Sequence, residues 1–317
     1  MRNILTLCAA CLVSLLGYLV LFGFVVSRPM VVDQLGQYMA WKQAYAAATP
    51  HPKLFVVAGS NARMSHSCAV LEEMLHRPCV NMGITAEAGL DWTLNATKQD
   101  MAAGDLVYLP IEYDIYDTPR VRLYSMMDAA YRFRHDKASL AERGPEGIVR
   151  AAFMFDLSVL VKSVGETVLN AAGVHRRFNL GTLNKQGDET GHDDDKALPY
   201  LSVIKSVHEE VPNSERLLRR ADGSQAALTQ FLDWCRDHKV TAVGGLPTIF
   251  NDQPVPDIVV TKLKNFYTAH GAQFIVLPNR SQYPRAMFYD TGYHLRQSAQ
   301  AAHTRLLALY LAPLLPR

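Results

Sequence analysis

A short apolar run ends at a glycine and a serine in the sequence Lys53-Leu54-Phe55-Val56-Val57-Ala58-Gly59-Ser60-Asn61. The apolar residues 54–57 predict a buried β-strand, and residues 58–60 predict the turn that closes it. A helical pattern follows over residues 62–75. A strand–turn–helix unit is typical of a parallel sheet, and it exposes the Ser60 hydroxyl at the carboxyl end of the strand.

The same alternation of short apolar strands and amphipathic helices continues along the chain. Strands are predicted at residues 79–82, 106–111, 240–243 and 274–277, and helices at residues 86–102, 224–238, 256–270 and 298–311. Short apolar strands between helices favour a parallel sheet with helices on both faces. The expected fold class is therefore α/β, a three-layer α/β/α arrangement with about five parallel strands.

The middle of the chain, about residues 114–222, does not alternate in this way. It contains a helical pattern near residues 157–172 and a polar stretch, residues 186–196, that reads QGDETGHDDDK. We expect a mainly helical insertion over the strand ends, where ligands bind in open α/β sheets. The polar stretch contains the metal-ligand types Asp188, Glu189, His192, Asp193, Asp194 and Asp195. Its flanking glycines favour a solvated, flexible loop over a metal site, so we expect neither a metal nor a cofactor.

The amino terminus contains an uncharged run, Ile4–Val26. At about 1.5 Å per residue the run spans the ~30 Å hydrocarbon core of a bilayer. It exceeds the roughly 7–15 apolar residues of a secretory signal, so an uncleaved signal anchor is expected, with cleavage as the alternative. The predicted organisation is an anchor at residues 1–30, a juxtamembrane helix and linker at 31–52, and one domain at 53–317 with the insertion at 114–222.

Arg2 flanks the short end of the anchor, and the positive-inside rule places that end in the cytoplasm. The rest of the chain then lies outside the inner membrane, which in a bacterium with two membranes is the periplasm.

The composition is ordinary for a globular protein, with 49% hydrophobic and 20% charged residues and a net charge of +2. A weakly basic chain without clustered Lys or Arg gives little support to nucleic-acid binding. Cys68 and Cys79 are open to two interpretations, a disulfide or two separate buried thiols.

Three polar residues suggest chemistry. Ser60 precedes a helix, whose unpaired N–H groups suit an oxyanion, although a serine there also serves as a helix cap. His294 is a candidate general base, and Asp290, four residues earlier, is placed to fix its tautomer. Taken alone, an Asp and a His four residues apart are equally typical of a solvated loop.

Together, Gly59-Ser60-Asn61, Asn81-Met82-Gly83 and the Asp290–His294 loop resemble the SGNH (GDSL-like) hydrolase superfamily. The resemblance covers about residues 53–112 and 239–312. It implies that Ser60 is the nucleophile and Gly83 an oxyanion donor, with His294 as the base and Asp290 as its partner.

Two departures from the family pattern refine this resemblance. The family usually has Asp-x-x-His, whereas the longer Asp290–His294 spacing looks like the branch of the teichoic-acid D-alanyl transfer proteins. After the third strand, Pro110-Ile111-Glu112-Tyr113 replaces the usual Gly-x-Asn-Asp and is similar to the periplasmic alginate acetyltransferases. Asn61 is then a candidate second oxyanion donor. Glu112, Arg63 and Tyr113 are candidate substrate contacts, and a structural carboxylate is the alternative for Glu112.

Three functions are compatible with these features. The first is a membrane-anchored O-acyltransferase that acetylates an exopolysaccharide or envelope glycan through an acyl-Ser60 intermediate, with the acyl group supplied by a multi-span membrane acyltransferase. The second is an esterase of the same fold. The third is a non-catalytic glycan-binding subunit of a polysaccharide secretion complex, with a groove lined by Tyr113, Tyr116, Tyr124 and Tyr131.

Overall fold

The computed structural model describes residues 2–27, 32–118, 129, 132–134, 136–154, 157–174, 182–213, 215–218 and 222–315. The chain divides into two compact units. One contains Met1–Gln37 and Leu123–Phe178, and the other contains Tyr38–Arg122 and Asn179–Arg317. The segment predicted as an insertion is therefore shared: its middle belongs with the amino-terminal helix, and its carboxyl-terminal part belongs with the sheet.

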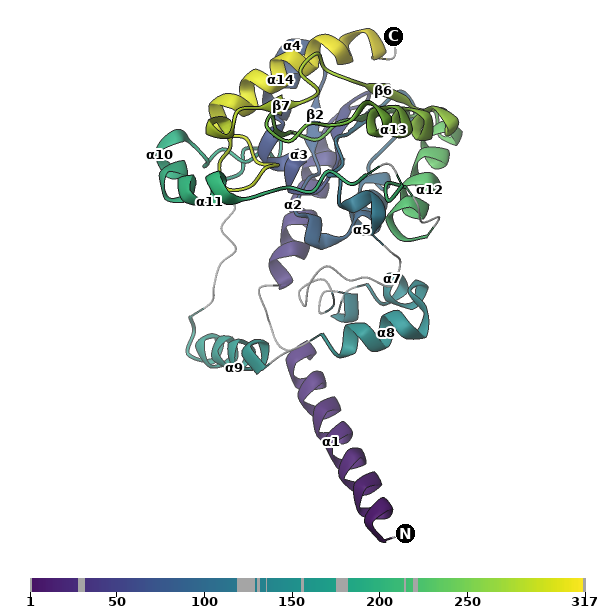
Figure 1. The fold of residues 1–317 in the computed structure, drawn as a ribbon, viewed down its shortest axis with the longest axis vertical. Coiled ribbons are helices and arrows are strands. Elements are labelled where there is room, and N and C mark those ends of the chain that lie inside the picture. Colours follow the sequence, from purple (N-terminus) through teal and green to yellow (C-terminus); the bar gives the residue numbers. More distant parts are fainter. Residues whose placement is uncertain are drawn as a thin grey trace. The chain divides into compact units, whose positions relative to one another are not determined.

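The second unit is built on a five-stranded parallel sheet, which confirms the predicted α/β class (Figure 1). Its strands, in spatial order, are β2 (Cys79–Asn81), β1 (Leu54–Val56), β3 (Leu106–Leu109), β4 (Thr241–Gly245) and β6 (Gln273–Ile275). The chain runs from β1 to one neighbour and then to the other, so the strand order reverses between β1 and β3. Ligands of open α/β sheets bind at this reversal, beyond the carboxyl ends of the strands.

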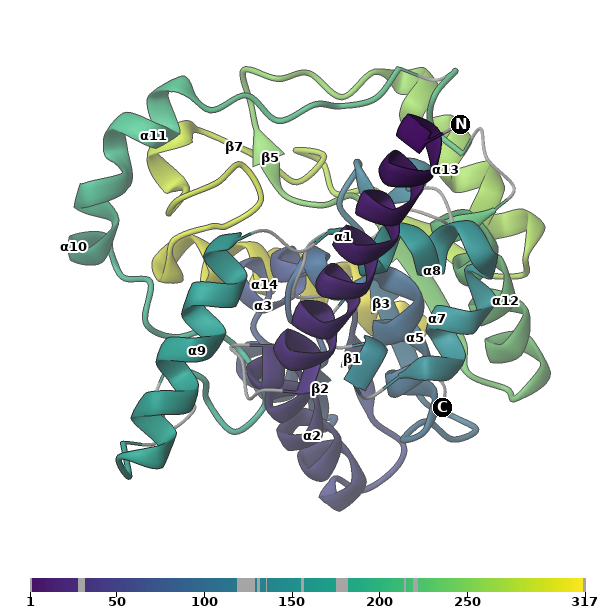
Figure 2. The ribbon, with the colours of Figure 1, turned by 90° about the horizontal axis from the view of Figure 1, so that it is seen from below.

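Two groups of helices pack with the sheet (Figure 2). The helices α3 (Ser60–Ser65) and α4 (Cys68–Leu75) pack against α14 (Gln297–Leu311). In the other group, α5 (Leu90–Lys98) packs against α12 (Gly223–Asp237), and α13 (Asp257–Ala269) packs on β4 and β6. Right-handed crossovers put these two groups on opposite faces. The first three strands are buried throughout, as their continuous apolar sequences predict.

Several elements differ from the predicted ones. The helix expected at 62–75 is two helices, because the Ser67 hydroxyl caps a new helix by accepting from the Val70 N–H at 3.3 Å. A short parallel pair, β5 (Ile249–Phe250) and β7 (Gln282–Tyr283), was not predicted. The remaining short elements of this unit are η1 (Ala86–Ala88), η2 (Ile115–Asp117), α10 (Asp194–Ala197), η3 (Leu198–Tyr200), α11 (Leu201–Ser206), η4 (Arg285–Met287) and η5 (Ala312–Leu314).

Only part of the polar stretch 186–196 is the solvated loop that its composition suggests: residues 193–196 are exposed, whereas residues 186–189 are buried. Asp188 is 1% exposed, and its carboxylate accepts from the N–H groups of Cys68 at 2.7 Å and Ala69 at 3.0 Å, at the start of α4. The same carboxylate accepts from the Asn81 amide at 3.0 Å and the Ser67 hydroxyl at 3.1 Å. The prediction failed because a carboxylate surrounded by buried donors is stable inside a protein, and sequence alone does not show those donors.

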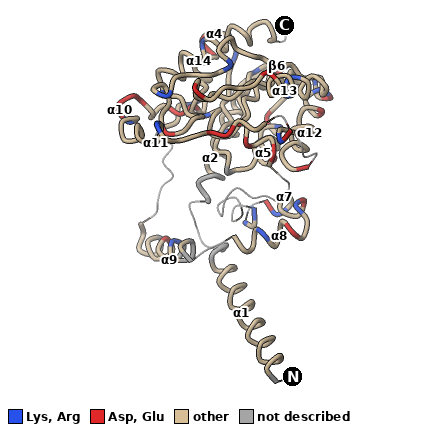
Figure 3. Tube along the Cα trace, viewed as in Figure 1, with Lys and Arg blue, Asp and Glu red and all other residues tan. Residues whose placement is uncertain are grey.

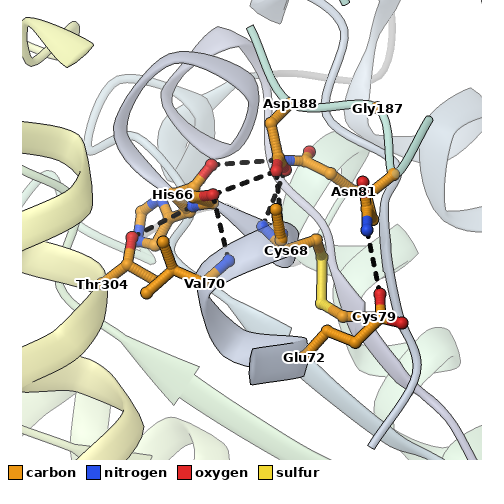
Figure 4. Close-up of a disulfide and its surroundings, with 12 residues drawn as sticks. His66, Cys68, Val70, Glu72, Cys79, Asn81, Gly187, Asp188 and Thr304 are labelled. Atoms are coloured by element: carbon orange, nitrogen blue, oxygen red, sulfur yellow. Dashed lines mark hydrogen bonds between the residues drawn. A yellow bond between two sulfur atoms is a disulfide. The ribbon is translucent and has the colours of Figure 1, made fainter. Parts of the chain in front are cut away.

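A disulfide, drawn in Figure 4, and a buried amine complete this cluster. Cys68 and Cys79 are bonded, with a Cα–Cα distance of 5.0 Å, which ties the start of α4 to β2. The helix α2 (Val32–Ala48) contributes Lys42, which is fully buried and donates to the carbonyls of Asn81 at 2.6 Å and Gly187 at 2.8 Å. Burial lowers the pKa of Lys42 to about 7.

The first unit contains α1 (Arg2–Ser27), which has no Lys, Arg, Asp or Glu after Arg2 (Figure 3). Within the described residues, one helix is long and apolar enough to cross a membrane: Asn3–Phe24, with a mean hydropathy of 2.5. The described part of this unit also contains α7 (Lys137–Glu142), α8 (Gly144–Ala152) and α9 (Leu157–Ala171). α7 and α8 pack together, and α1 contacts α9.

Asp188→Asn tests the buried carboxylate. The amide offers one acceptor oxygen where several donors converge, so the free energy of unfolding is expected to fall by roughly 3 kcal/mol. Urea unfolding of the full chain in detergent measures the change. The matched control is Asp195→Asn, an exposed carboxylate of the same acidic stretch, which is expected to leave stability unchanged. Equal effects of the two variants would contradict a structural role for Asp188.

Candidate active site

Three of the predicted site residues follow neighbouring parallel strands. Ser60 follows β1 and begins α3, Gly83 follows β2, and Glu112 follows β3. They therefore lie at the same edge of the sheet, beside the point where the strand order reverses. Ser60 is half-buried, whereas the strand before it is fully buried.

Glu112 holds the backbone on both sides of Ser60. Its carboxylate accepts from the N–H of Gly59 at 3.0 Å and from the N–H of Asn61 at 2.9 Å. The side chain is 2% exposed, and burial raises its pKa to about 7, partly offset by these two hydrogen bonds. Glu112 therefore positions the Ser60 turn from inside the fold. These bonds fit the alternative interpretation of Glu112 as a structural carboxylate. They go to the turn around Ser60 rather than to the insertion.

Two glycines allow the strand ends to approach this closely. A Cβ at Gly59 would lie 2.5 Å from the Glu112 carboxylate and 2.8 Å from the Ala86 nitrogen. A Cβ at Gly83 would lie 2.8 Å from the Gly59 carbonyl and 2.7 Å from the Arg63 nitrogen. Any side chain at either position would push the Ser60 turn away from its neighbours.

His294 and Asp290 form a hydrogen-bonded pair, with 2.6 Å between Nδ1 and Oδ1. Burial alone would raise the pKa of Asp290, but its hydrogen bond and ion pairing with His294 lower it below the usual value. The loop that contains them is closed by the Tyr289 N–H, which donates to the His294 carbonyl at 2.7 Å. An ionised carboxylate on Nδ1 leaves Nε2 as the ring nitrogen that can accept a proton.

Two hydroxyl groups attach this loop to α3. Ser65 Oγ donates to the Tyr293 carbonyl at 2.7 Å and accepts from the Leu295 N–H at 2.9 Å, so it binds the backbone on both sides of His294. Thr248 Oγ1 lies 3.0 Å from both Ser65 Oγ and the Tyr293 carbonyl. Ser60 begins α3 and Ser65 ends it, so the same short helix holds Ser60 and the His294 loop.

The two predicted oxyanion donors are engaged within the protein. The Gly83 N–H donates to the side-chain oxygen of Asn81 at 3.1 Å. The Asn61 side chain is fully buried; its amide donates to the Pro110 carbonyl at 2.7 Å, and its oxygen accepts from Thr248 at 2.8 Å. Asn61 therefore joins β3 to Thr248, and its amide does not reach the surface where a substrate would bind.

Of the predicted substrate contacts, Arg63 remains at the surface of the site and Tyr113 does not. Arg63 is 20% exposed, with its Nε 3.7 Å from the Glu189 carboxylate and its guanidinium 5.8 Å from the Tyr38 ring centre. Tyr113 is fully buried, and burial raises its pKa. Tyr113 is therefore a core residue, because the chain turns inward after Glu112.

Several residues that build this site are not recognisable from the sequence alone. Ser65 and Thr248 are ordinary hydroxyl residues, and their role depends on the tertiary approach of α3 to the His294 loop. His192 came from the stretch interpreted as solvated, yet it is 1% exposed and its ring lies 5.9 Å from the Tyr289 ring. Burial lowers the pKa of His192 to about 4, which keeps the ring uncharged beside His294.

Glu112→Gln removes one of two acceptor oxygens, so one buried N–H beside Ser60 loses its partner. The free energy of unfolding is expected to fall by about 1–3 kcal/mol. Burial raises the pKa of Glu112 from its usual 4.5 to about 7, so in this range the folded protein keeps a proton that the unfolded chain releases. The stability that depends on this proton is lost as the pH rises through the same range.

The stability difference between wild type and Glu112→Gln should therefore shrink between about pH 5 and about pH 8. Urea unfolding of the full chain across that range measures it. Glu73→Gln, at an exposed position of α4, is the control and should show no such trend. A difference that grows with pH would show that the ionised carboxylate is the stabilising form.

Comparison of the chain with protein-family models, curated proteins and solved structures finds no match. The functional assignment accordingly depends on the residues at the sheet edge. These residues are a serine at a strand–helix turn, a carboxylate that holds this turn, and a His–Asp pair whose loop is attached to the same helix.

Proposed function

We propose that the chain is a membrane-anchored O-acyltransferase of the SGNH type, which transfers an acetyl group to a glycan through an acyl-Ser60 intermediate. The observation that carries the proposal is the attachment of the Asp290–His294 loop to α3, the helix that Ser60 begins. A serine, a histidine and an aspartate held by one short element are the groups that nucleophilic acyl transfer requires.

In the first half-reaction, Ser60 Oγ attacks the carbonyl carbon of an acyl donor ester. His294 Nε2 takes the hydroxyl proton, and Asp290 stabilises the resulting imidazolium. Glu112 already accepts from the N–H groups of Gly59 and Asn61, so we propose the Ser60 N–H between them as the backbone donor to the oxyanion. The intermediate collapses, the donor alkoxide takes the proton from His294, and Ser60 retains the acyl group.

In the second half-reaction, a sugar hydroxyl attacks the acyl-Ser60 carbonyl. His294 takes the proton of that hydroxyl and returns it to Ser60 Oγ as the ester bond to the enzyme breaks. An esterase follows the same steps with water as the acceptor. The chemistry of this site therefore supports the esterase as well as it supports the transferase. The glycan-binding alternative is less well supported, because Tyr113 and Tyr116 are buried, while Tyr124 and Tyr131 lie outside the described residues.

The proposed location is the inner membrane of a bacterium, with the sheet unit in the periplasm. The uncharged α1 supports an anchor, and the Cys68–Cys79 disulfide suits an oxidising compartment. In this setting a multi-span membrane acyltransferase is the proposed source of the acyl group, and a polysaccharide is the proposed acceptor.

Ser60→Ala tests the nucleophile. The full chain in detergent is expected to hydrolyse 4-nitrophenyl acetate and to gain the mass of one acetyl group on Ser60. Ser60→Ala should lose the adduct and at least about 100-fold of the rate. Stopped assays and intact-mass spectrometry measure both quantities, and Ser206→Ala, at an exposed serine of α11, is the matched control.

An adduct that moves to an added oligosaccharide supports the transferase, and one that is lost only to water supports the esterase. An adduct that persists in Ser60→Ala would exclude Ser60 as the nucleophile.

Thr248→Val tests the attachment of the His294 loop to α3. The variant keeps the shape of the side chain but removes the hydroxyl that contacts Ser65, Asn61 and the Tyr293 carbonyl. We expect kcat for 4-nitrophenyl acetate to fall roughly 10- to 100-fold with little change in KM, because the base is misplaced. Thr248→Ser retains the hydroxyl and should keep most of the activity; equal losses in both variants would contradict this role.

A further inference from the structure

The amino-terminal helix does not stand alone within its unit. The Tyr18 hydroxyl donates to the Ala152 carbonyl at the end of α8, and its ring stacks on Phe153 with 4.8 Å between ring centres and 7° between ring planes. One turn later, the Phe22 ring meets Phe133 edge-on at 4.8 Å. We call the part of the insertion that belongs to this unit, Leu123–Phe178, the inserted segment. Its residues Phe133, Ala152 and Phe153 pack against the last third of α1, the helix that is apolar enough to span a membrane.

These contacts set the depth of the inserted segment relative to the apolar span. The span runs from Asn3 to Phe24, and Tyr18 lies six residues before its end, which is about 9 Å along the helix axis. Phe153 is level with Tyr18, so it lies inside the limit of the span. Helices that lie in a membrane interface are buried about 5–10 Å into the boundary between headgroups and acyl chains.

Apolar side chains of the same segment are uncovered. Phe153 remains 55% exposed despite its contact with Tyr18. On α9, which contacts α1, the residues Val161, Val164 and Val168 are 63%, 43% and 62% exposed. Their spacing puts the three valines on one face of the helix, whereas Lys162 lies on the opposite side. We call Phe153, Val161, Val164 and Val168 the apolar face.

We propose that the inserted segment is an interfacial membrane element, with the apolar face embedded in lipid at the carboxyl-terminal end of α1. The occupant is the bilayer, because α1 fixes the height of Phe153 and α9, which carries the three valines, contacts α1. Aromatic rings at that level are typical of membrane interfaces. In α8, the exposed Glu146–Arg150 ion pair, at 2.9 Å, gives the element the mixed polar and apolar character that an interfacial helix needs. The inference rests on the proposed insertion of α1.

Quenching of a fluorescent label tests the proposal in the full chain. Cys8 and Cys11 are first replaced by serine, and Cys235 is buried. A single cysteine is then introduced by Val164→Cys, labelled with an environment-sensitive fluorophore, and the protein is placed in nanodiscs of phosphatidylcholine and phosphatidylglycerol. Lys162→Cys is the matched control on the same helix, Val168→Cys repeats the measurement, and Val13→Cys reports on α1.

Labels at positions 164 and 168 should be quenched severalfold more strongly by doxyl-labelled lipid than the label at position 162, with the reverse order for aqueous iodide. Lipid quenching at 13 with iodide quenching at 164 and 168 would overturn the interfacial element and retain the anchor. Iodide quenching of the label at position 13 as well would overturn both the interfacial element and the membrane anchor. Protection of 164 and 168 from both quenchers would assign the apolar face to a second copy or a protein partner, which also overturns the proposal.

Discussion

The bonding of Glu112 to the turn around Ser60 is the constraint on which the candidate site depends. A carboxylate that follows β3 accepts from two N–H groups that follow β1, so the neighbouring strand ends are fixed to each other at atomic distances. Gly59 is required there because any side chain would strike that carboxylate. The strand ends on either side of the reversal of strand order are thus joined by hydrogen bonds, and the half-buried Ser60 lies at this junction.

The second requirement is that a loop near the carboxyl terminus meets a helix near the start of the sheet unit. Hydroxyl groups of Ser65 and Thr248 join backbone atoms around His294 to α3, in a region where Asn61 is also fully paired. Buried polar networks of this kind are stable only when every member is satisfied. The loop around His294 is therefore held by these hydrogen bonds and also by a buried apolar cluster that includes Phe250, Phe288 and Leu295.

The sequence predicted the sheet well and the site only in part. Continuous apolar runs identified the strands, because buried parallel strands have little choice of residue. Ser60 and the Asp290–His294 pair were recognisable because local chain order places them at strand or helix ends. The failures concern polar burial. Composition predicted Asp188 and His192 to be solvated, and its position after the third strand predicted Tyr113 to contact substrate; only their tertiary neighbours explain their place in the interior.

The order of elements along the chain has a consequence for synthesis and folding. β3 and β4 are adjacent in the sheet, yet residues 110–240 separate them along the chain. That stretch includes Leu123–Phe178, which belongs to the same unit as α1. Closing so long a connection costs entropy before the pairing can repay it, so this step is expected to be slow. The half-sheet of β2, β1 and β3 is complete early, whereas His294 is supplied near the end of the chain. A nascent chain therefore contains Ser60, the proposed nucleophile, well before it contains the proposed base.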